Sequence, residues 1–296
     1  MKIILTGSSG FLGRIISTNF PKEEMITIGR SNSDILCDLS ASIPHISICD
    51  IVIHAAGKAH SVPKTPSEKE AFFAVNVNGT KNLLRGLEEA PVLPKSFIFI
   101  SSVSVYGLNS GHAVNEGHPL NAKDPYGLSK VHAEQLISEW CEKNGIICTI
   151  LRLPLLVGTN PPGNLGAMIK AIKKGYYLNI AGGKARRSMV MAEDIAKVIP
   201  KLAEVGGIYN LTDGYHPSFE ELSRHIAHEL RKPIPKNIPA WIALFMAKIG
   251  NLMGKKFPFN SYKLSKITTD LTFDDSKAQQ IFKWKPTPVL ESFKIE

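Results

Sequence analysis

Short runs of β-forming residues alternate with stretches of helical periodicity along the first 155 residues of the chain. This alternation is typical of βαβ units, in which each helix connects two parallel strands. The runs are almost entirely apolar, as expected for strands that helices cover on both faces. They are Lys2–Thr6, Met25–Ile28, Asp50–Ala56, Ser96–Ser101 and Ile147–Leu153. The chain is therefore predicted to form an α/β fold with a doubly wound parallel sheet.

The pattern changes near residue 155. Pro161, Pro162 and Gly163, followed by glycine pairs at 182–183 and 206–207, separate shorter elements. We predict one domain over residues 1–155 and a smaller C-terminal α/β domain over residues 156–296 that partly interleaves with the first. A cleft between two such domains is the usual place for a ligand.

Composition limits the class of protein further. The chain has 296 residues, of which 44% are apolar, so it can bury a sizeable core, and disordered or collagen-like chains are excluded. No uncharged segment reaches the roughly 18 residues of a spanning helix. The four cysteines form no CxxC pair, so neither a zinc site nor a disulfide framework is expected. These features favour a soluble protein of the reducing cytoplasm. The net charge is +9, and the basic residues are interleaved with acidic ones. This charge would attract a phosphorylated small molecule as well as it would attract nucleic acid.

A glycine-rich turn follows the first predicted strand directly. Gly7, Gly10 and Gly13 form a GxxGxxG motif that opens a predicted helix with apolar residues such as Phe11 and Leu12. Glycines at this spacing permit a tight turn and bring backbone N–H groups close to a pyrophosphate at the helix N-terminus. The alternative is a glycine-rich turn without a ligand, because such a motif is weak by itself.

The end of the second predicted strand bears on which dinucleotide would bind. Folds that prefer NAD usually place an acidic residue here to hold the ribose 2′-hydroxyl, but this chain has Arg30. An arginine receives a 2′-phosphate, which favours NADP, although Arg30 also fits a solvated surface position and Asp34 lies close by in the sequence. Asp38 and Leu39 follow a third short strand, where they are placed to meet the adenine.

Tyr126 and Lys130 are four residues apart in a segment of helical character, so they share one helix face. An ammonium beside a phenol stabilises the phenolate and lowers its pKa from about 10. The pair is a candidate proton-transfer device, although the same spacing occurs by chance on many helices. Upstream, Ser101–Gly107 places several hydroxyl groups at the end of a predicted strand, where open α/β sheets bind ligands.

Three motifs in this order resemble the extended short-chain dehydrogenase/reductase family, in particular its nucleotide-sugar epimerases, dehydratases and reductases. They are GxxGxxG from Gly7, SSxSVYG from Ser101 and YxxxK from Tyr126. Further matches are His54-Ala55-Ala56-Gly57, Asn76-Val77-Asn78-Gly79-Thr80, Arg152, Asn164, Arg187, Asp194 and the segment 274–286. The resemblance covers essentially the whole chain and implies a Rossmann-like sheet with a C-terminal substrate domain.

The resemblance implies a role for each matching residue. Tyr126 is expected to be the general acid/base, Lys130 to lower its pKa and hold the nicotinamide ribose, and Ser102 to hydrogen-bond the reacting oxygen. The implied cofactor-binding residues are Gly7, Ser9, Gly10, Phe11, Leu12, Gly13, Arg30, Asp38, Leu39, Ala55, Ala56, Gly57, Asn76, Ser101, Tyr126, Lys130 and Leu153. The implied substrate-binding residues are Ser102, Ser104, Tyr126, Asn164 and Arg187. Arg187 also fits an ordinary surface charge beside Arg186.

Departures from the family pattern favour one reaction. The Asp-Glu pair of the dehydratases is absent between Ser101 and Tyr106, so dehydration is rejected. The acidic residue after the second strand, usual in hexose 4-epimerases, is replaced by Arg30. We therefore expect an NAD(P)-dependent oxidoreductase that acts at C4 of a nucleotide-diphosphate hexose, by reduction of a 4-keto-6-deoxy sugar for polysaccharide synthesis. The alternatives are a UDP-hexose 4-epimerase that retains NAD and a non-catalytic nucleotide sensor on the same fold.

The expected ligands and partners follow from this interpretation. The cofactor is NAD or NADP, with NADP preferred, and the substrate is a nucleotide-diphosphate sugar, with UDP favoured. A homodimer through the helices that bear Tyr126 and Asn76 is a family expectation. No metal, nucleic acid or stable membrane insertion is expected. The apolar segment 238–253, followed by Lys255 and Lys256, is interpreted as a helix packed over the substrate domain, with a membrane-surface helix as the alternative.

Overall fold

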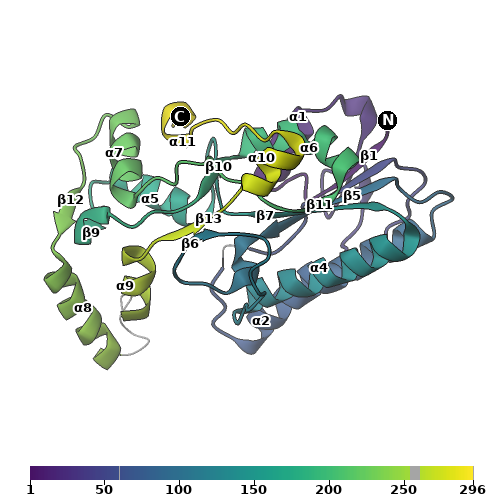
Figure 1. The fold of residues 1–296 in the computed structure, drawn as a ribbon. Helices are drawn as coiled ribbons and strands as arrows, with labels where there is room; N and C mark the ends of the chain where they lie inside the picture. The colour runs from purple at the N-terminus through teal and green to yellow at the C-terminus, as the bar shows by residue number, and fades with distance from the viewer. Residues whose placement is uncertain (60, 254–260, 296) are drawn as a thin grey trace.

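A seven-stranded parallel sheet forms the centre of the protein in a computed structural model, which describes residues 1–59, 61–253 and 261–295 (Figure 1). The strand order is β11-β7-β5-β4-β1-β2-β3. Its strands are β1 (Ile3–Thr6), β2 (Met25–Gly29), β3 (Ile35–Leu36), β4 (Ile51–His54), β5 (Ser96–Ser102), β7 (Ile147–Leu153) and β11 (Gly207–Asn210). This sheet confirms the predicted doubly wound α/β fold.

Helices cover both faces of the sheet, and strand residues alternate between them. Ile3 and Leu5 of β1 pack with α1 (Phe11–Thr18), α6 (Ala192–Val205) and α10 (Ser276–Phe282). Ile4, between them, packs with α3 (Gly79–Glu88) and α4 (Pro125–Asn144) on the opposite face. Successive side chains point to opposite faces of a strand, so a strand buried on both faces must be apolar throughout. Figure 1 shows the long α4 below the sheet and α6 and α10 above it.

The order of the strands fixes where a ligand can bind. The chain runs from β1 to β2 and β3 on one side, then returns to β4 on the other side of β1. The direction of winding therefore changes at β1, and open α/β sheets bind ligands beyond the carboxyl ends of the strands at such a point. The glycine turn at Gly7 and the segment from Ala55 begin at these two carboxyl ends.

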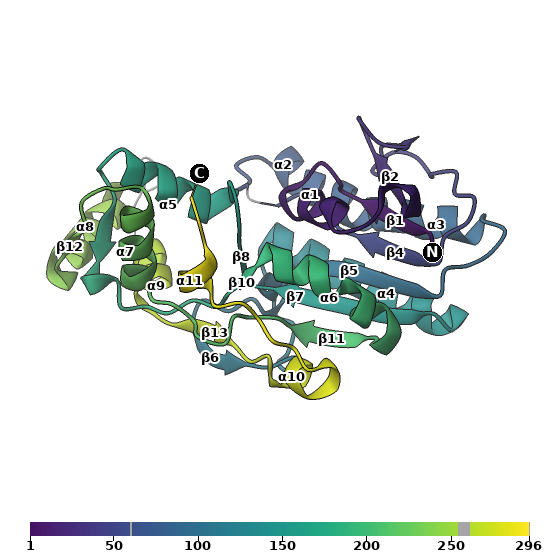
Figure 2. The same ribbon diagram turned by 90° about the horizontal axis from the view of Figure 1, so that it is seen from above.

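The C-terminal part of the chain is interleaved with the sheet. Strand β11 and helices α6 and α10 belong to the sheet unit, whereas α5, α7, α8 and α9 gather at one end of the molecule (Figure 2). The boundary at residue 155 stays a prediction. The remaining helices are α2 (Pro66–Phe73), α5 (Gly163–Lys173), α7 (Phe219–Glu229), α8 (Ala240–Met253), α9 (Ser261–Thr268) and α11 (Val289–Ser292). Short helical turns are η1 (Lys22–Glu24), η2 (Ala74–Asn78), η3 (Val103–Tyr106) and η4 (Ala181–Gly183).

The described residues also form three two-stranded parallel sheets. They are β8 (Leu155–Val157) with β10 (Met189–Met191), β9 (Leu178–Ile180) with β12 (Lys236–Ile238), and β6 (Gly111–Val114) with β13 (Leu271–Phe273). Strand β6 joins two parts of the chain about 160 residues apart, a pairing that the sequence pattern did not reveal.

The apolar helix expected over segment 238–253 is present as α8, but it is not a core helix. Ala243 and Ala247 are buried against α9, whereas Trp241, Leu244 and Phe245 are exposed. Small residues fill its inner face, so its bulky residues lie outside. Lys255 and Lys256, which follow it in the sequence, lie outside the described residues. None of the helices in the described part of the chain is long and apolar enough to cross a membrane.

Candidate active site

A cleft of about 680 Å³ lies at the carboxyl ends of β1, β4, β5 and β7. It runs from the glycine turn, past the end of β5, to the start of α4. Twelve of the predicted cofactor-binding residues line it, namely Gly7, Ser9, Gly10, Phe11, Leu12, Gly13, Ala55, Gly57, Ser101, Tyr126, Lys130 and Leu153. Ser102 and Ser104, predicted to bind substrate, line it as well. Residues from five separate segments of the sequence therefore share one site.

The glycine turn needs its glycines for two reasons. Gly7 has a positive φ of 75°, and a Cβ there would lie 2.6 Å from the backbone nitrogen of Ala56. A Cβ on Gly13 would lie 2.0 Å from the carbonyl oxygen of Gly7, so the helix could not approach the strand. Helix α1 begins at Phe11, and no side chain caps its first N–H groups. Its positive end faces the cleft as an anion-binding terminus.

A buried hydrogen-bond chain holds the segment after β4 against the end of β1. The hydroxyl of Thr6 accepts from the backbone N–H of Ala56 at 3.1 Å and lies 2.7 Å from Nδ1 of His54. Nε2 of His54 lies 3.0 Å from the hydroxyl of Thr80. Burial, with a smaller contribution from Lys130, lowers the pKa of His54 to about 3, so the ring is neutral. His54 is thus a structural residue that holds Ala55 at the cleft, whereas Ala56, also predicted to bind the cofactor, is not among the residues that line it.

Asn76 connects this segment to α4. Its Oδ1 accepts from the N–H of Lys58 at 2.7 Å, and its Nδ2 donates to the Ser129 hydroxyl at 2.8 Å and to the Lys58 carbonyl at 3.1 Å. The side chain is 2% exposed, and all three of its bonds go to the protein. Asn76 therefore holds the cleft wall, which fits a supporting role and not a direct contact.

The residues expected near the adenine end do not all face the cleft. Arg30 is exposed immediately after β2, and its positive charge helps to lower the pKa of Asp38, after the stronger effect of two hydrogen bonds from Ser40. The Asp34 carboxylate is bound to β2, because it accepts hydrogen bonds from the N–H and the hydroxyl of Thr27 at 2.8 and 2.7 Å. Leu39 packs in the core against α3. Arg30 is thus left as an exposed cation at the end of β2.

Tyr126 enters the cleft because of how α4 begins. Asp124 caps the helix by accepting from the N–H of Gly127 at 3.0 Å, and Pro125 supplies the preset backbone angle of the first turn. Tyr126 therefore stands in the first turn, where its phenol bonds the hydroxyl of Ser102. Burial raises the pKa of Tyr126, the Ser102 bond opposes this, and the Asp124 charge raises it further.

Lys130 lies one turn further along α4 and is 5% exposed. Its Nζ donates to the carbonyl of Ile100 at 2.8 Å and lies 4.5 Å from the centre of the Phe99 ring. Burial lowers the pKa of Lys130 to about 8, and the nearby carboxylate of Glu134 opposes the shift. We expected Lys130 to lower the pKa of Tyr126, but the structure gives a raised pKa. The Lys130 ammonium donates to the carbonyl of Ile100, and burial is the largest effect on the Tyr126 phenol.

A buried ion pair supports the helix that carries both residues. Glu134 lies one turn beyond Lys130, and its Oε2 accepts from Nη2 of Arg152 at 2.8 Å. Both side chains are 4% exposed. Ser101 donates to Glu134, so its hydroxyl points away from the cleft that its backbone lines. Nη1 of Arg152 donates to the Tyr106 hydroxyl at 3.3 Å, which extends the network to the end of β5.

Two of the predicted substrate residues lie outside the cleft lining. Asn164 is exposed in the first turn of α5. Arg187 is half-buried, and its guanidinium donates to the carbonyls of Arg186, Thr269 and Lys266. The last two belong to the carboxyl end of α9, which attracts cations. The surroundings of Arg187 were not visible in the sequence, because Lys266 and Thr269 lie about 80 residues away.

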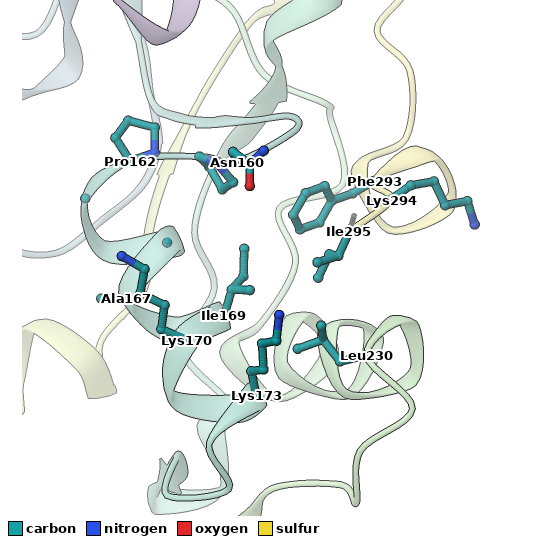
Figure 3. A pocket seen from close by; sticks show the side chains of 13 residues that line it. Asn160, Pro162, Ala167, Ile169, Lys170, Lys173, Leu230, Phe293, Lys294 and Ile295 are labelled. Atoms are coloured by element: carbon teal, nitrogen blue, oxygen red, sulfur yellow. The ribbon is translucent and has the colours of Figure 1, made fainter.

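A second cavity of about 530 Å³ lies between α5, the end of α7 and the C-terminal segment (Figure 3). Asn160 and Pro162 line both this cavity and the cleft, so the two adjoin at the turn before α5. Lys170 and Lys173 of α5 line its cationic side.

Several cleft residues were not predicted. Arg14, Lys58, Ala59, Ile100, Val103, Pro154, Leu155, Leu156, Asn160 and Pro162 complete the lining. Lys58 was accessible to sequence reasoning, since it directly follows the His54–Gly57 match. The turn at Asn160 was not, because it follows β8, whose partner β10 lies more than 30 residues further along the chain.

The cleft fits a nicotinamide dinucleotide. Its glycine turn lacks the side chains that would fill the space next to an uncapped helix terminus, as a pyrophosphate site requires. Lys130 and Tyr126 stand at the other end of the same cavity. Among the residues that the structure describes, no group of three or more His, Cys, Asp or Glu could hold a metal ion.

Comparison with protein families gives one match. The model of the NAD dependent epimerase/dehydratase family matches residues 3–212. An Escherichia coli O157:H7 protein named N-acetyl-α-D-glucosaminyl-diphospho-ditrans,octacis-undecaprenol 4-epimerase is 28% identical over 93% of this chain and 88% of its own length. UDP-glucose 4-epimerase of Vibrio cholerae is 27% identical over 99% and 93%. GDP-6-deoxy-D-mannose reductase of Pseudomonas aeruginosa is 26% identical over 76% and 79%.

Solved structures share the fold over nearly the whole chain. MoeE5 in complex with UDP-glucose and NAD has a TM-score of 0.76 at 19% identity, covering 98% of this chain and 95% of that one. RMD from Pseudomonas aeruginosa complexed with NADPH has a TM-score of 0.71 at 19% identity, covering 98% and 96%.

Proposed function

The chain belongs to the NAD-dependent epimerase/dehydratase family, and from this premise we propose that it is an NADP-dependent reductase of a 4-keto-6-deoxy sugar linked to a nucleoside diphosphate, UDP being favoured. The observation that carries the proposal is the meeting of Tyr126, Ser102 and Lys130 in the cleft that the glycine turn also lines. A cytoplasmic homodimer in polysaccharide precursor synthesis remains the predicted setting.

The cofactor would lie along the cleft. The uncapped end of α1 and the glycine turn would hold the pyrophosphate, and Lys130 would hold the nicotinamide ribose. When bound, the nicotinamide supplies or accepts the hydride at the sugar carbon. Arg30 directly follows β2 and is the predicted partner of an additional phosphate on the adenosine ribose, and Asp34, the nearest carboxylate in the sequence, is occupied by Thr27. The exposed Arg30, whose charge also acts on Asp38, and an Asp34 carboxylate that Thr27 occupies together favour NADP.

The chain's own residues would handle the proton. The Tyr126 phenol, whose pKa burial raises, is protonated at neutral pH and can give its proton to the oxygen at C4 as that oxygen gains charge. The Ser102 hydroxyl bonds the phenol and would share its hydrogen bond with the same oxygen. Because the tyrosine begins protonated, the site suits reduction of a ketone at neutral pH.

The second candidate is a 4-epimerase that retains NAD. It is favoured by the two relatives named as epimerases, which match more than nine tenths of this chain, whereas the reductase matches 76%. The Escherichia coli relative is named for a sugar carried on undecaprenyl diphosphate, so a lipid-linked diphosphate sugar is an additional substrate to test. In either case Arg187 remains the predicted contact to the diphosphate, and Asn164 remains a predicted substrate-binding residue.

Cofactor binding separates the two candidates. The purified protein is first denatured and its supernatant examined for NAD or NADP, and the protein is then titrated with NADPH and NADH by fluorescence. The reductase is supported if the protein is purified without a dinucleotide, binds NADPH more tightly than NADH, and oxidises one NADPH for each 4-keto sugar nucleotide that it reduces. Retained NAD, with turnover of a UDP-hexose and no net change at 340 nm, supports the epimerase instead. Binding without turnover of any of these sugars would leave a nucleotide sensor.

A further inference from the structure

Helix α8 packs against the rest of the protein through small residues. Ala243 and Ala247 are 1% and 0% exposed and contact Leu264 of α9. Ile180, Ile238 and Ile267 pack against this small cluster. The inner face of α8 is therefore covered by close packing of the two helices, and its outer face has no partner among the residues that the structure describes. Figure 1 shows α8 at the end of the molecule remote from the main sheet.

The outer face carries bulky apolar side chains. Trp241, Leu244 and Phe245 are 71%, 54% and 63% exposed. Together with the exposed Lys248 they follow the spacing of three and four residues that places side chains on one helix face. A contiguous exposed patch of this kind marks an interaction surface, and Trp, Phe and Leu beside lysine are typical of helices that lie in a membrane interface.

The stretch of sequence that contains α8 carries only basic charged residues. Residues 230–269 contain eight lysines and arginines and no aspartate or glutamate. Lys255 and Lys256, which are among the eight, lie outside the described residues and enter this argument only through the sequence. Two copies of the chain meeting through this face would bring like charges together, because a twofold interface apposes the same surface on both partners. An anionic surface matches the charge instead.

We propose that the outer face of α8 docks onto an anionic lipid bilayer, with Trp241, Leu244 and Phe245 in the headgroup region and the exposed Lys248 against anionic headgroups. Apolar burial and electrostatic attraction act together in such binding, and neither requires the helix to cross the bilayer. The proposal does not depend on the substrate, since it would hold for a soluble or a lipid-linked sugar.

Tryptophan fluorescence gives a direct test. Trp140 and Trp284 are 7% and 6% exposed, so Trp241 is the tryptophan that solvent and lipid reach. We expect vesicles of phosphatidylcholine with phosphatidylglycerol to shift the emission to shorter wavelength and to sediment the protein, and vesicles of phosphatidylcholine alone to do so at least tenfold less. Raising the salt concentration should weaken the binding, because it screens the lysines.

Variants locate the contact. Trp241→Ser with Phe245→Ser should lower the affinity for anionic vesicles at least tenfold, whereas Ile281→Ser, which removes a side chain of similar exposure (54%) on α10, should not. Thermal melting and NADPH titration show whether each variant remains folded. The proposal would be overturned if the α8 variant sedimented with anionic vesicles as well as the unsubstituted protein does. It would also be overturned if the protein bound neutral vesicles as tightly as anionic ones, or if vesicles left the tryptophan emission unshifted. A homodimer that dissociates on α8 substitution would overturn it in favour of a second copy.

Discussion

Replacing Glu134 by glutamine tests how the catalytic helix is held. The carboxylate contacts Arg152 at 2.8 Å, and both side chains are 4% exposed, so the substitution leaves a buried guanidinium without its counter-charge. Breaking a buried pair in this way costs about 3–5 kcal/mol of unfolding free energy. At about 2–4 °C per kcal/mol for a chain of this size class, the melting temperature should fall by roughly 6–20 °C.

The control is Glu139→Gln on the same helix. Glu139 is exposed, and its substitution should change the unfolding free energy by less than about 0.5 kcal/mol. Urea unfolding followed by fluorescence of the buried Trp140 measures both variants. Replacing both Glu134 and Arg152 by leucine should destabilise less than Glu134→Gln, because no buried charge is then left unpaired. The reasoning would be refuted if Glu134→Gln lowered the unfolding free energy no more than Glu139→Gln does.

The same variant should alter the pH profile. The Glu134 carboxylate opposes the effect of burial on Lys130, whose pKa is about 8. Without that charge the pKa of Lys130 falls further, so the ammonium is lost at lower pH. The alkaline limb of the kcat/KM profile should therefore move to lower pH, and Glu139→Gln should leave it in place. A merely structural role for Glu134 would lower activity without moving this limb.

Four further outcomes are expected. Tyr126→Phe should reduce turnover by about 10²–10⁴ and leave the Kd for NADPH nearly unchanged, as judged by assay at 340 nm and fluorescence titration, and full activity would contradict its assigned role. Arg30→Ala should raise the Kd for NADPH by about tenfold while that for NADH hardly changes, and equal effects on both would remove the argument for a 2′-phosphate. Gly13→Ala should cost about 1–3 kcal/mol of stability and weaken binding of both dinucleotides, because the added Cβ would meet the Gly7 carbonyl at 2.0 Å, and tight binding by a stable variant would show that the turn adapts. Lys130 releases its proton near pH 8 in the folded protein but only near its unperturbed pKa of about 10 in the unfolded chain, so it makes the unfolding free energy rise with pH between about 8 and 10. Lys130→Met should flatten that rise, which urea titrations at several pH values measure. An unchanged slope would contradict the lowered pKa of Lys130.

The glycine turn and the Tyr126–Lys130 pair were predictable from local rules, whereas the other predicted cleft residues came from the family resemblance. Gly7 and Gly13 are needed where a strand turns into a helix, and a Cβ at either would meet backbone in the structure. Tyr126 and Lys130 are one turn apart on any helix, so their shared face follows from spacing alone. Parallel strands carry all these segments to one edge of the sheet, so the strand pattern was enough to predict that they meet.

Other features depended on contacts between distant segments. Leu39 faces the core and not the cleft because α3 covers it, and Arg187 is bound to the carbonyls at the end of α9. The pKa of Tyr126 is raised because the end of β5 and the neighbouring residues bury it, whereas spacing alone suggested the opposite effect from Lys130. Helix α3, the end of α9 and the end of β5 are all distant in the sequence from the residues they contact. The periodicity of the sequence therefore carries no information about these contacts.

The sequence by itself determined the parallel sheet, the glycine turn and the Tyr126–Lys130 pair, because strand period, helix period and glycine stereochemistry act over a few residues. Only the tertiary structure decided which charges are occupied and which surfaces are free. Asp34 is bound by Thr27 while Arg30 stays exposed, and α8 turns its alanines inward and its tryptophan outward. Burial and pairing are properties of the packed chain, since each depends on segments that folding brings together from distant positions.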